Sequence, residues 1–143
     1  MFGRIVLAMT VVLSLLWSTG AVADVNMDEG MWEITMKTEM PGMPVEMPPM
    51  TSTQCLTKKD NVPQQQEKDV DCTMVSHKIE GNTVSWIIKC RMKEGGTAES
   101  TGRVTYSGRS FKGTMKTVVM NEPSAGRMEV TQHMSGKRIG DCK

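Results

Sequence analysis

"TMVSHKIEGNTVSWIIKC", residues 73–90, decides the fold class. Apolar and polar residues alternate on both sides of a Gly-Asn pair, which suits a two-residue turn between antiparallel strands. Closing the chain at this turn aligns three pairs on one face of the hairpin: Ile79 with Val84, His77 with Trp86, and Val75 with Ile88. The shared apolar face supports this register, because a slip of one residue would turn one strand's apolar side chains outward.

The same alternation continues downstream, where "KEGG", residues 93–96, forms the next turn. A three-residue loop over 94–96 keeps charged side chains off the apolar face, whereas a four-residue loop would bury them. This loop aligns Trp86 with Val104 and Val84 with Tyr106.

Two further strands follow this hairpin. "YSGRSF", residues 106–111, turns at its glycine and pairs Tyr106 with Phe111, a favourable cross-strand aromatic contact. The last strand, "RMEVTQHMSG" at residues 127–136, again alternates apolar and polar residues.

Upstream, "MWEITMKTEM" at residues 31–40 places four apolar side chains on one face: Trp32, Ile34, Met36 and Met40. Only residues 56–69 break the pattern. Thr57 and Asp60 resemble a capping box, which predicts one short helical turn near residues 57–62. We therefore predict an all-β domain, an antiparallel meander of six to seven strands. Its sheet must curl or close into a small barrel, because its one apolar face has to be buried.

Residues 1–23 have the features of a secretory signal peptide. Arg4 precedes an apolar stretch at residues 5–17, which is shorter than the ~20 residues that a membrane-spanning helix needs. The A-x-A cleavage pattern follows and ends at Ala23. We expect a single domain of residues 24–143, located in the periplasm or outside the cell and without an integral membrane segment.

Four cysteines lie in this domain, and in an oxidising compartment an even number indicates disulfides. Three pairings are possible. Cys72 and Cys90 flank the first hairpin and come close to opposite each other if a one-residue bulge or a frayed start shifts Cys72. We favour Cys72–Cys90, which leaves Cys55–Cys142 to tie the C-terminal tail to the segment after the second strand.

Composition argues against several functional classes. Residues 24–143 carry 16 basic and 16 acidic residues, so no electrostatic footprint for nucleic acid is present. His77 and His133 are the only histidines, and no nucleophile lies in a recognisable motif with a base. We expect neither catalysis nor a cofactor.

The methionine-rich stretch "MKTEMPGMPVEMPPM", residues 36–50, raises three hypotheses. The first is a site for a small apolar or amphipathic ligand, lined by Trp32, Met36, Met40, Trp86 and Tyr106, because methionine-lined surfaces adapt to varied ligands; a filled core without a cavity is the competing interpretation. The second is a Cu(I) site, because thioethers are soft ligands; its ligands would be Met40, Met43, Met47 and Met50. The third is a protein partner that docks on the extended residues 41–49. We expect these methionines to bury apolar surface or line a ligand cavity, without a resident metal.

Several stretches resemble a family of small exported bacterial proteins, domain of unknown function 3617: "EGMWEITMKTEMPGMP", "TSTQCLT", "GNTVSWIIKC", "GRVTYSGRSFKGTMK" and "MSGKRIGDC". The resemblance spans nearly all of residues 24–143 and implies export and an all-β domain, but no activity. Gly30 and Trp32 also resemble the G-x-W at the start of lipocalin barrels, where a basic residue near the last strand covers the tryptophan. Arg138 would take that part here.

Overall fold

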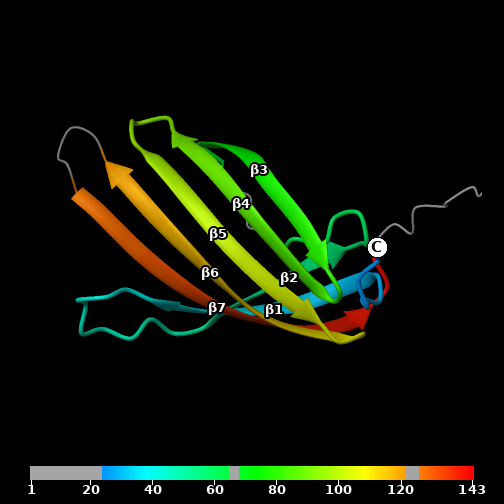
Figure 1. Ribbon diagram of the computed structural model, residues 1–143. Helices are drawn as coiled ribbons and strands as arrows, with labels where there is room; N and C mark the ends of the chain where they lie inside the picture. Colours follow the sequence, from blue (N-terminus) through cyan, green and yellow to red (C-terminus); the bar gives the residue numbers. More distant parts are fainter. Residues whose placement is uncertain (1–23, 65–67, 122–125) are drawn as a thin grey trace, which may run out of the picture.

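The computed structural model describes residues 24–64, 68–121 and 126–143, and its regular secondary structure is entirely β (Figure 1). The signal-peptide prediction lies outside these residues. Seven antiparallel strands form one sheet: β1 Gly30–Glu39, β2 Met50–Leu56, β3 Val70–Glu80, β4 Thr83–Met92, β5 Thr97–Tyr106, β6 Ser110–Asn121 and β7 Gly126–Gly140. In the ranges described, no helix is long and apolar enough to cross a membrane. The all-β prediction is confirmed.

The order of the strands across the sheet is β2-β1-β7-β6-β5-β4-β3. Strands β3 to β7 form the predicted meander, and β1 pairs with β7, so the two ends of the chain meet within the sheet. The sheet curls into a half-barrel (Figure 1). Strands β2 and β3 form its two edges, and the connection between them therefore crosses from one edge to the other.

The first hairpin has the predicted turn, with Ile79 opposite Val84 and His77 opposite Trp86. The third predicted pair is wrong, because Ile88 lies opposite Met74 rather than Val75. A β-bulge at Val75 accommodates one extra residue in β3, and this extra residue brings Cys72 directly opposite Cys90.

The predicted register of β4 with β5 is wrong by two residues. Trp86 lies opposite Gly102, and Val84 lies opposite Val104. The loop still has three residues but occupies Lys93–Gly95, closed by a hydrogen bond of 3.2 Å from the Met92 N–H to the Gly96 carbonyl. The observed register follows from the space that the Trp86 indole needs. A Cβ on Gly102 would lie 2.3 Å from the Trp86 ring, so only glycine at this position leaves room for the buried indole.

The apolar face is sealed at one end by two segments outside the sheet. Val25 and Met27, from the N-terminal segment, and Val62, from the β2–β3 connection, are each 3 % exposed. The short helical turn expected near residues 57–62 is wrong: this segment forms a bend, closed by reciprocal backbone hydrogen bonds of 3.1 and 3.2 Å between Thr57 and Asp60. The bend leads directly into the buried residues 61–63, which pack on the sheet.

Both disulfides have the favoured pairing. Cys72–Cys90 joins the edge strand β3 to β4, with a Cα–Cα distance of 4.0 Å. Cys55–Cys142 joins the other edge strand, β2, to the segment after β7, with a Cα–Cα distance of 5.5 Å. Each edge strand of the open sheet is therefore cross-linked to another segment of the chain.

The contact between Gly102 and Trp86 gives a first prediction. Gly102→Ala should lower the free energy of unfolding by about 1–3 kcal/mol, because overpacking a filled core forces neighbours to shift. Gly140→Ala is the control, since a Cβ there meets nothing within 4 Å. Urea denaturation of the two variants checks this, and equal stabilities would contradict the steric account.

The disulfides give a second prediction. Cys55 and Cys142 are 87 residues apart, whereas Cys72 and Cys90 are 18 apart. Cross-linking a longer loop removes more entropy from the unfolded chain. Replacing the Cys55–Cys142 pair by serines should therefore cost about 1.4 kcal/mol more than replacing the Cys72–Cys90 pair. Chemical denaturation of the two double variants measures the difference, and the reverse order would contradict the expectation.

Candidate functional site

The residues that the sequence suggested for a ligand site lie mainly in the filled core. Trp32, Trp86 and Tyr106 are at most 1 % exposed and Met36 is 5 % exposed, while Met40 lies just beyond β1 and is half-buried. The ring of Trp32 lies 5.8 Å from that of Tyr106 and 5.6 Å from that of Phe111, and the latter two rings are 5.3 Å apart. Such aromatic pairs contribute ~0.5–1.5 kcal/mol each beyond their buried area. Phe111, which the sequence-based site omitted, completes the cluster.

Polar groups at this sealed end have partners. The Trp32 indole N–H donates to the Asp28 carbonyl at 3.1 Å, and the Tyr106 hydroxyl donates to the Asn61 carbonyl at 2.6 Å. The Asn61 side-chain oxygen accepts a hydrogen bond from His77 Nε2 at 2.9 Å. Burial raises the pKa of the Tyr106 phenol well above its ordinary value of 10, and the nearby charge of Asp60 adds to the effect. The hydroxyl therefore stays protonated and continues to donate.

Arg138 is the basic residue that the lipocalin resemblance places near Trp32. It is the cross-strand partner of Trp32, and its side chain is 17 % exposed. Its Nε donates to the Glu29 carbonyl at 2.8 Å, and its guanidinium also pairs with Asp141. A Cβ on Gly30 would lie 2.6 Å from Arg138 Nε, so glycine is needed for this approach. Arg138 thus links the last strand to the segment before β1.

Trp86 differs from Trp32 in one respect. Its Nε1 is buried, yet it has no hydrogen-bond partner among the described residues. A buried donor without an acceptor costs ~1–3 kcal/mol. Trp86 also lies next to Ile88 on the same face of β4, where the dense core ends and the covering becomes thinner.

Beyond Trp86 the inner face continues as an apolar strip, defined by Met74, Ile88, Ala98, Val119, Met128 and Val130. Exposure increases along the strip, from 8 % at Ile88 to 40 % at Met74 and 41 % at Met128. The polar residues between its members bond to each other, as Ser100 Oγ and Thr117 Oγ1 do at 2.8 Å. The strip is the less covered end of the same face that holds the aromatic cluster.

Residues 40–49 connect β1 to β2, and we call them the methionine arm. Figure 1 shows the arm extending past the sheet at the end where the β4–β5 turn lies. A turn at Met40 to Met43 begins it, with Gly42 at a φ of +88°. Met43, Met47 and, at the start of β2, Met50 are 58, 41 and 64 % exposed. Of the four methionines considered for Cu(I), only Met40 is therefore partly buried. Across the described ranges, no group of three or more His, Cys, Asp or Glu residues is arranged to hold a metal.

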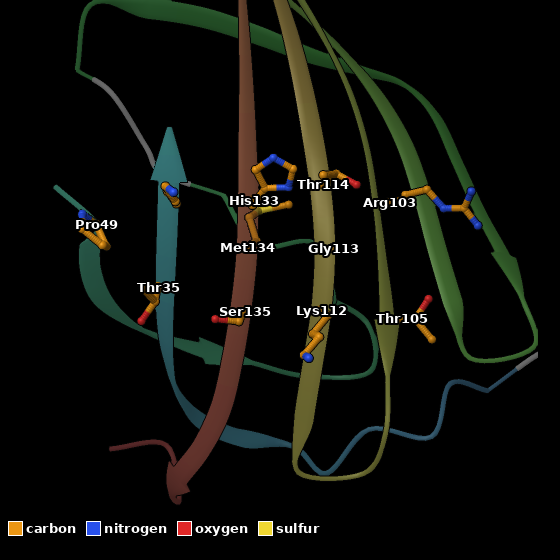
Figure 2. Close-up of a pocket in the computed structure, with 11 residues that line it drawn as sticks. Thr35, Pro49, Arg103, Thr105, Lys112, Gly113, Thr114, His133, Met134 and Ser135 are labelled. Carbon is orange, nitrogen blue, oxygen red and sulfur yellow. The ribbon is translucent and has the colours of Figure 1, made fainter. Parts of the chain in front are cut away.

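The outer face of the sheet carries a shallow hollow of about 660 Å³, shown in Figure 2. We call it the basic hollow. Its basic residues are Lys37, Arg103, Lys112 and His133, and its hydroxyl residues are Thr35, Thr105, Thr114 and Ser135. They form two cross-strand rows over β5, β6, β7 and β1 (Figure 2): Arg103, Thr114, His133 and Lys37 in one row, and Thr105, Lys112, Ser135 and Thr35 in the next. His133 Nε2 lies 3.4 Å from Glu39 Oε2.

A family model described as "Protein of unknown function (DUF3617)" matches residues 27–142. The chain belongs to this family. The matched range begins at the buried Met27 and ends at Cys142, so it contains all four cysteines of the two disulfides. Comparisons with curated proteins and with solved structures found no match.

The basic hollow of this DUF3617 chain was not predicted from the sequence. Its members come from four strands that lie far apart in the chain, and Lys37 and His133 are neighbours only because β1 pairs with β7. The sequence gives only a weak indication of this hollow. Each of these residues occupies a polar position of an alternating strand, which indicates that its side chain points outward but not which side chains lie beside it on other strands.

The buried phenol of Tyr106, the only tyrosine of the chain, gives a third prediction. Its pKa is raised in the folded state, so its contribution to stability is present below the unfolded value of about 10 and is lost as the pH rises above it. Tyr106→Phe should remove this alkaline loss. At neutral pH the variant should be less stable by about 1–3 kcal/mol, because the Asn61 carbonyl loses its donor.

Urea denaturation of wild type and Tyr106→Phe between about pH 7 and pH 11 makes the comparison, and near-ultraviolet absorbance reports phenolate formation directly. The two proteins share every other side chain, so the difference between the two curves belongs to Tyr106. Parallel curves would show that the phenol is not protected by the fold.

Proposed function

We propose that this protein is a binding module for a single apolar or amphipathic molecule, which lies against the apolar strip. One observation carries the proposal: the same sheet face is fully covered at Trp32, with 0 % exposure, and about 40 % exposed at Met74 and Met128. Contiguous exposed apolar surface on a small domain is typical of an interaction site. Methionine suits such a site because its flexible, polarisable side chain adapts to the shape of a ligand.

The chemistry of the strip favours an apolar chain as the occupant. The inner-face positions from Ile88 across to Val130 carry no charged side chain, and Ser100 and Thr117 between them already bond to each other. An incoming hydrocarbon would therefore displace water without leaving a polar group unpaired. This gain follows the apolar area removed from water, ~25 cal/mol per Å².

The unpaired indole N–H of Trp86 supports an amphipathic ligand over a pure hydrocarbon. Trp86 is opposite Gly102, and Met115 follows in the same row one strand further. Met115 is only partly buried against the core. A rotation of the Met115 side chain would give an acceptor on the ligand access to the Trp86 donor. In this arrangement Trp32, Met36 and Tyr106 form the packed wall behind the ligand, and Met40 lies at the base of the methionine arm.

The proposal is binding without catalysis, after export from the cytoplasm. His77 is hydrogen-bonded to Asn61 and His133 is paired with Glu39, so each histidine already has a structural partner. Two disulfides are compatible with an oxidising extracellular compartment. Export through residues 1–23, with cleavage after Ala23, belongs to the same proposal.

A pair of adjacent substitutions tests the site and is the fourth prediction. Val130→Lys places a charge in the strip, whereas Thr131→Lys places the same charge at the next residue, which faces outward. Wild type and Thr131→Lys should bind the neutral probe N-phenyl-1-naphthylamine with an increase in its fluorescence. Val130→Lys should bind at least about tenfold more weakly, since burying a lysine against hydrocarbon is costly.

Met128→Lys, at a more exposed position, covers the case in which Val130→Lys fails to fold. Far-ultraviolet circular dichroism of every variant reports folding. A probe that binds all of these proteins equally, or does not bind wild type, would refute the proposed site. Native mass spectrometry of the protein from its source cells then searches for a co-purified molecule.

A further inference from the structure

We propose that the basic hollow on the outer face binds a ligand with several phosphoryl groups, independently of the apolar strip. The two sites lie on opposite faces of the sheet, because side chains at successive positions of a strand point to opposite faces. Lys112, for instance, faces outward from β6, while its neighbour Phe111 is 2 % exposed in the core.

The arrangement of charge is the first argument. The lining of the hollow includes three cations and one histidine but no carboxylate. Within the described ranges, no ion pair involves Lys37, Arg103 or Lys112. Two acidic residues of β1, at alternate positions from Lys37, are already paired: Glu39 with His133 at 3.4 Å and Glu33 with Lys137 at 3.1 Å.

This concentration is local, because residues 24–143 carry equal numbers of basic and acidic side chains. Lys37 lies opposite His133 on β7, and Lys112 lies on β6, one strand further. An anion held between Lys37 and Lys112 would be attracted by both ammonium groups. The net charge of the whole protein does not by itself attract anions, so the hollow would be the specific point of attachment.

The second argument is the placement of the donors. In one row Thr114 lies between Arg103 and His133, and in the other row Thr105 and Ser135 flank Lys112 (Figure 2). Phosphoryl oxygens accept short, charge-assisted hydrogen bonds from ammonium and guanidinium groups and further bonds from hydroxyls. Arg103 lies at the end of its row, where its guanidinium points away from His133 (Figure 2). As an exposed side chain it is free to turn toward a ligand.

The size of the hollow indicates more than one phosphoryl group. Its rows cross four adjacent strands, which are spaced ~4.8 Å apart, so the outer members of a row are ~14 Å apart. One phosphate cannot reach both ends of such a row. A chain of linked phosphates, or several phosphate headgroups in a membrane surface, can do so.

Isothermal titration at low salt with tripolyphosphate, on the full exported chain, tests the site and is the fifth prediction. The variant Lys37→Gln/Lys112→Gln removes two positive charges from the hollow. The control Lys89→Gln/Lys93→Gln removes two charges outside it, from side chains that pair with Glu99 and Asp69. We expect at least a tenfold loss of affinity in the first variant and less than a twofold change in the control. A parallel sedimentation assay with vesicles of phosphatidylglycerol or phosphatidylcholine identifies a lipid source of the same groups.

Tripolyphosphate binding that depends on Lys37 and Lys112 supports a soluble ligand. Binding to phosphatidylglycerol vesicles with the same dependence, and not to phosphatidylcholine, supports a headgroup. Equal losses in both double variants would show diffuse electrostatic attraction and overturn the site, as would the absence of binding in both assays. The neutral-probe assay of the apolar strip is unaffected by these lysines, so a failure here leaves the proposed function standing on its own test.

Discussion

The packing of Trp32, Tyr106 and Phe111 is the interaction on which the rest of this structure depends. These rings come from β1, β5 and β6, so their contacts join the first strand to the meander across the curl of the sheet. The cluster exists because glycine stands beside it: a Cβ on Gly136 would lie 2.1 Å from the Phe111 ring. The Tyr106 hydroxyl then holds the β2–β3 connection on the sheet through the Asn61 carbonyl.

A sheet with two open edges needs protection from pairing with strands of other chains. The core of this sheet is also small. Residues 24–143 contain one leucine, Leu56, and rely on methionine for much of their apolar volume. Methionine fills space but specifies packing weakly. The disulfides stabilise the two edge strands, each of which pairs with a neighbouring strand on one side only. Cys55 lies in one edge strand and Cys72 in the other.

The two faces of the sheet are suited to different chemistry, and this follows from the period of two. The inner face changes along its length from a dense aromatic core to the thinly covered methionines Met74 and Met128. The outer face has hydroxyl and basic side chains that meet across four strands. An amphipathic ligand on one face and phosphoryl groups on the other would use surfaces that share strands but no side chains. Three strands, β5, β6 and β7, contribute to both proposed sites.

The sequence by itself determined the antiparallel pattern, the faces of the strands that it predicted and the first turn. Alternation places Trp86 and Val84 inside whatever the exact pairing, and the Gly-Asn pair specifies where β3 turns into β4. The favoured disulfide pairing and the family resemblance likewise came from the sequence alone. Alternation is unchanged by a slip of two residues, however, so it could not choose between Val104 and Gly102 as the partner of Trp86.

Tertiary packing selects Gly102 as the partner of Trp86, because the indole fits only over a residue without a side chain. The sequence required a bulge or a frayed start to align Cys72 with Cys90, and the tertiary structure placed the bulge at Val75. The basic hollow depends on the pairing of β1 with β7, a contact between the two ends of the chain that local periodicity cannot encode. Local residue patterns specify which way a side chain points, whereas its neighbours across the sheet are set by how buried volumes fit together.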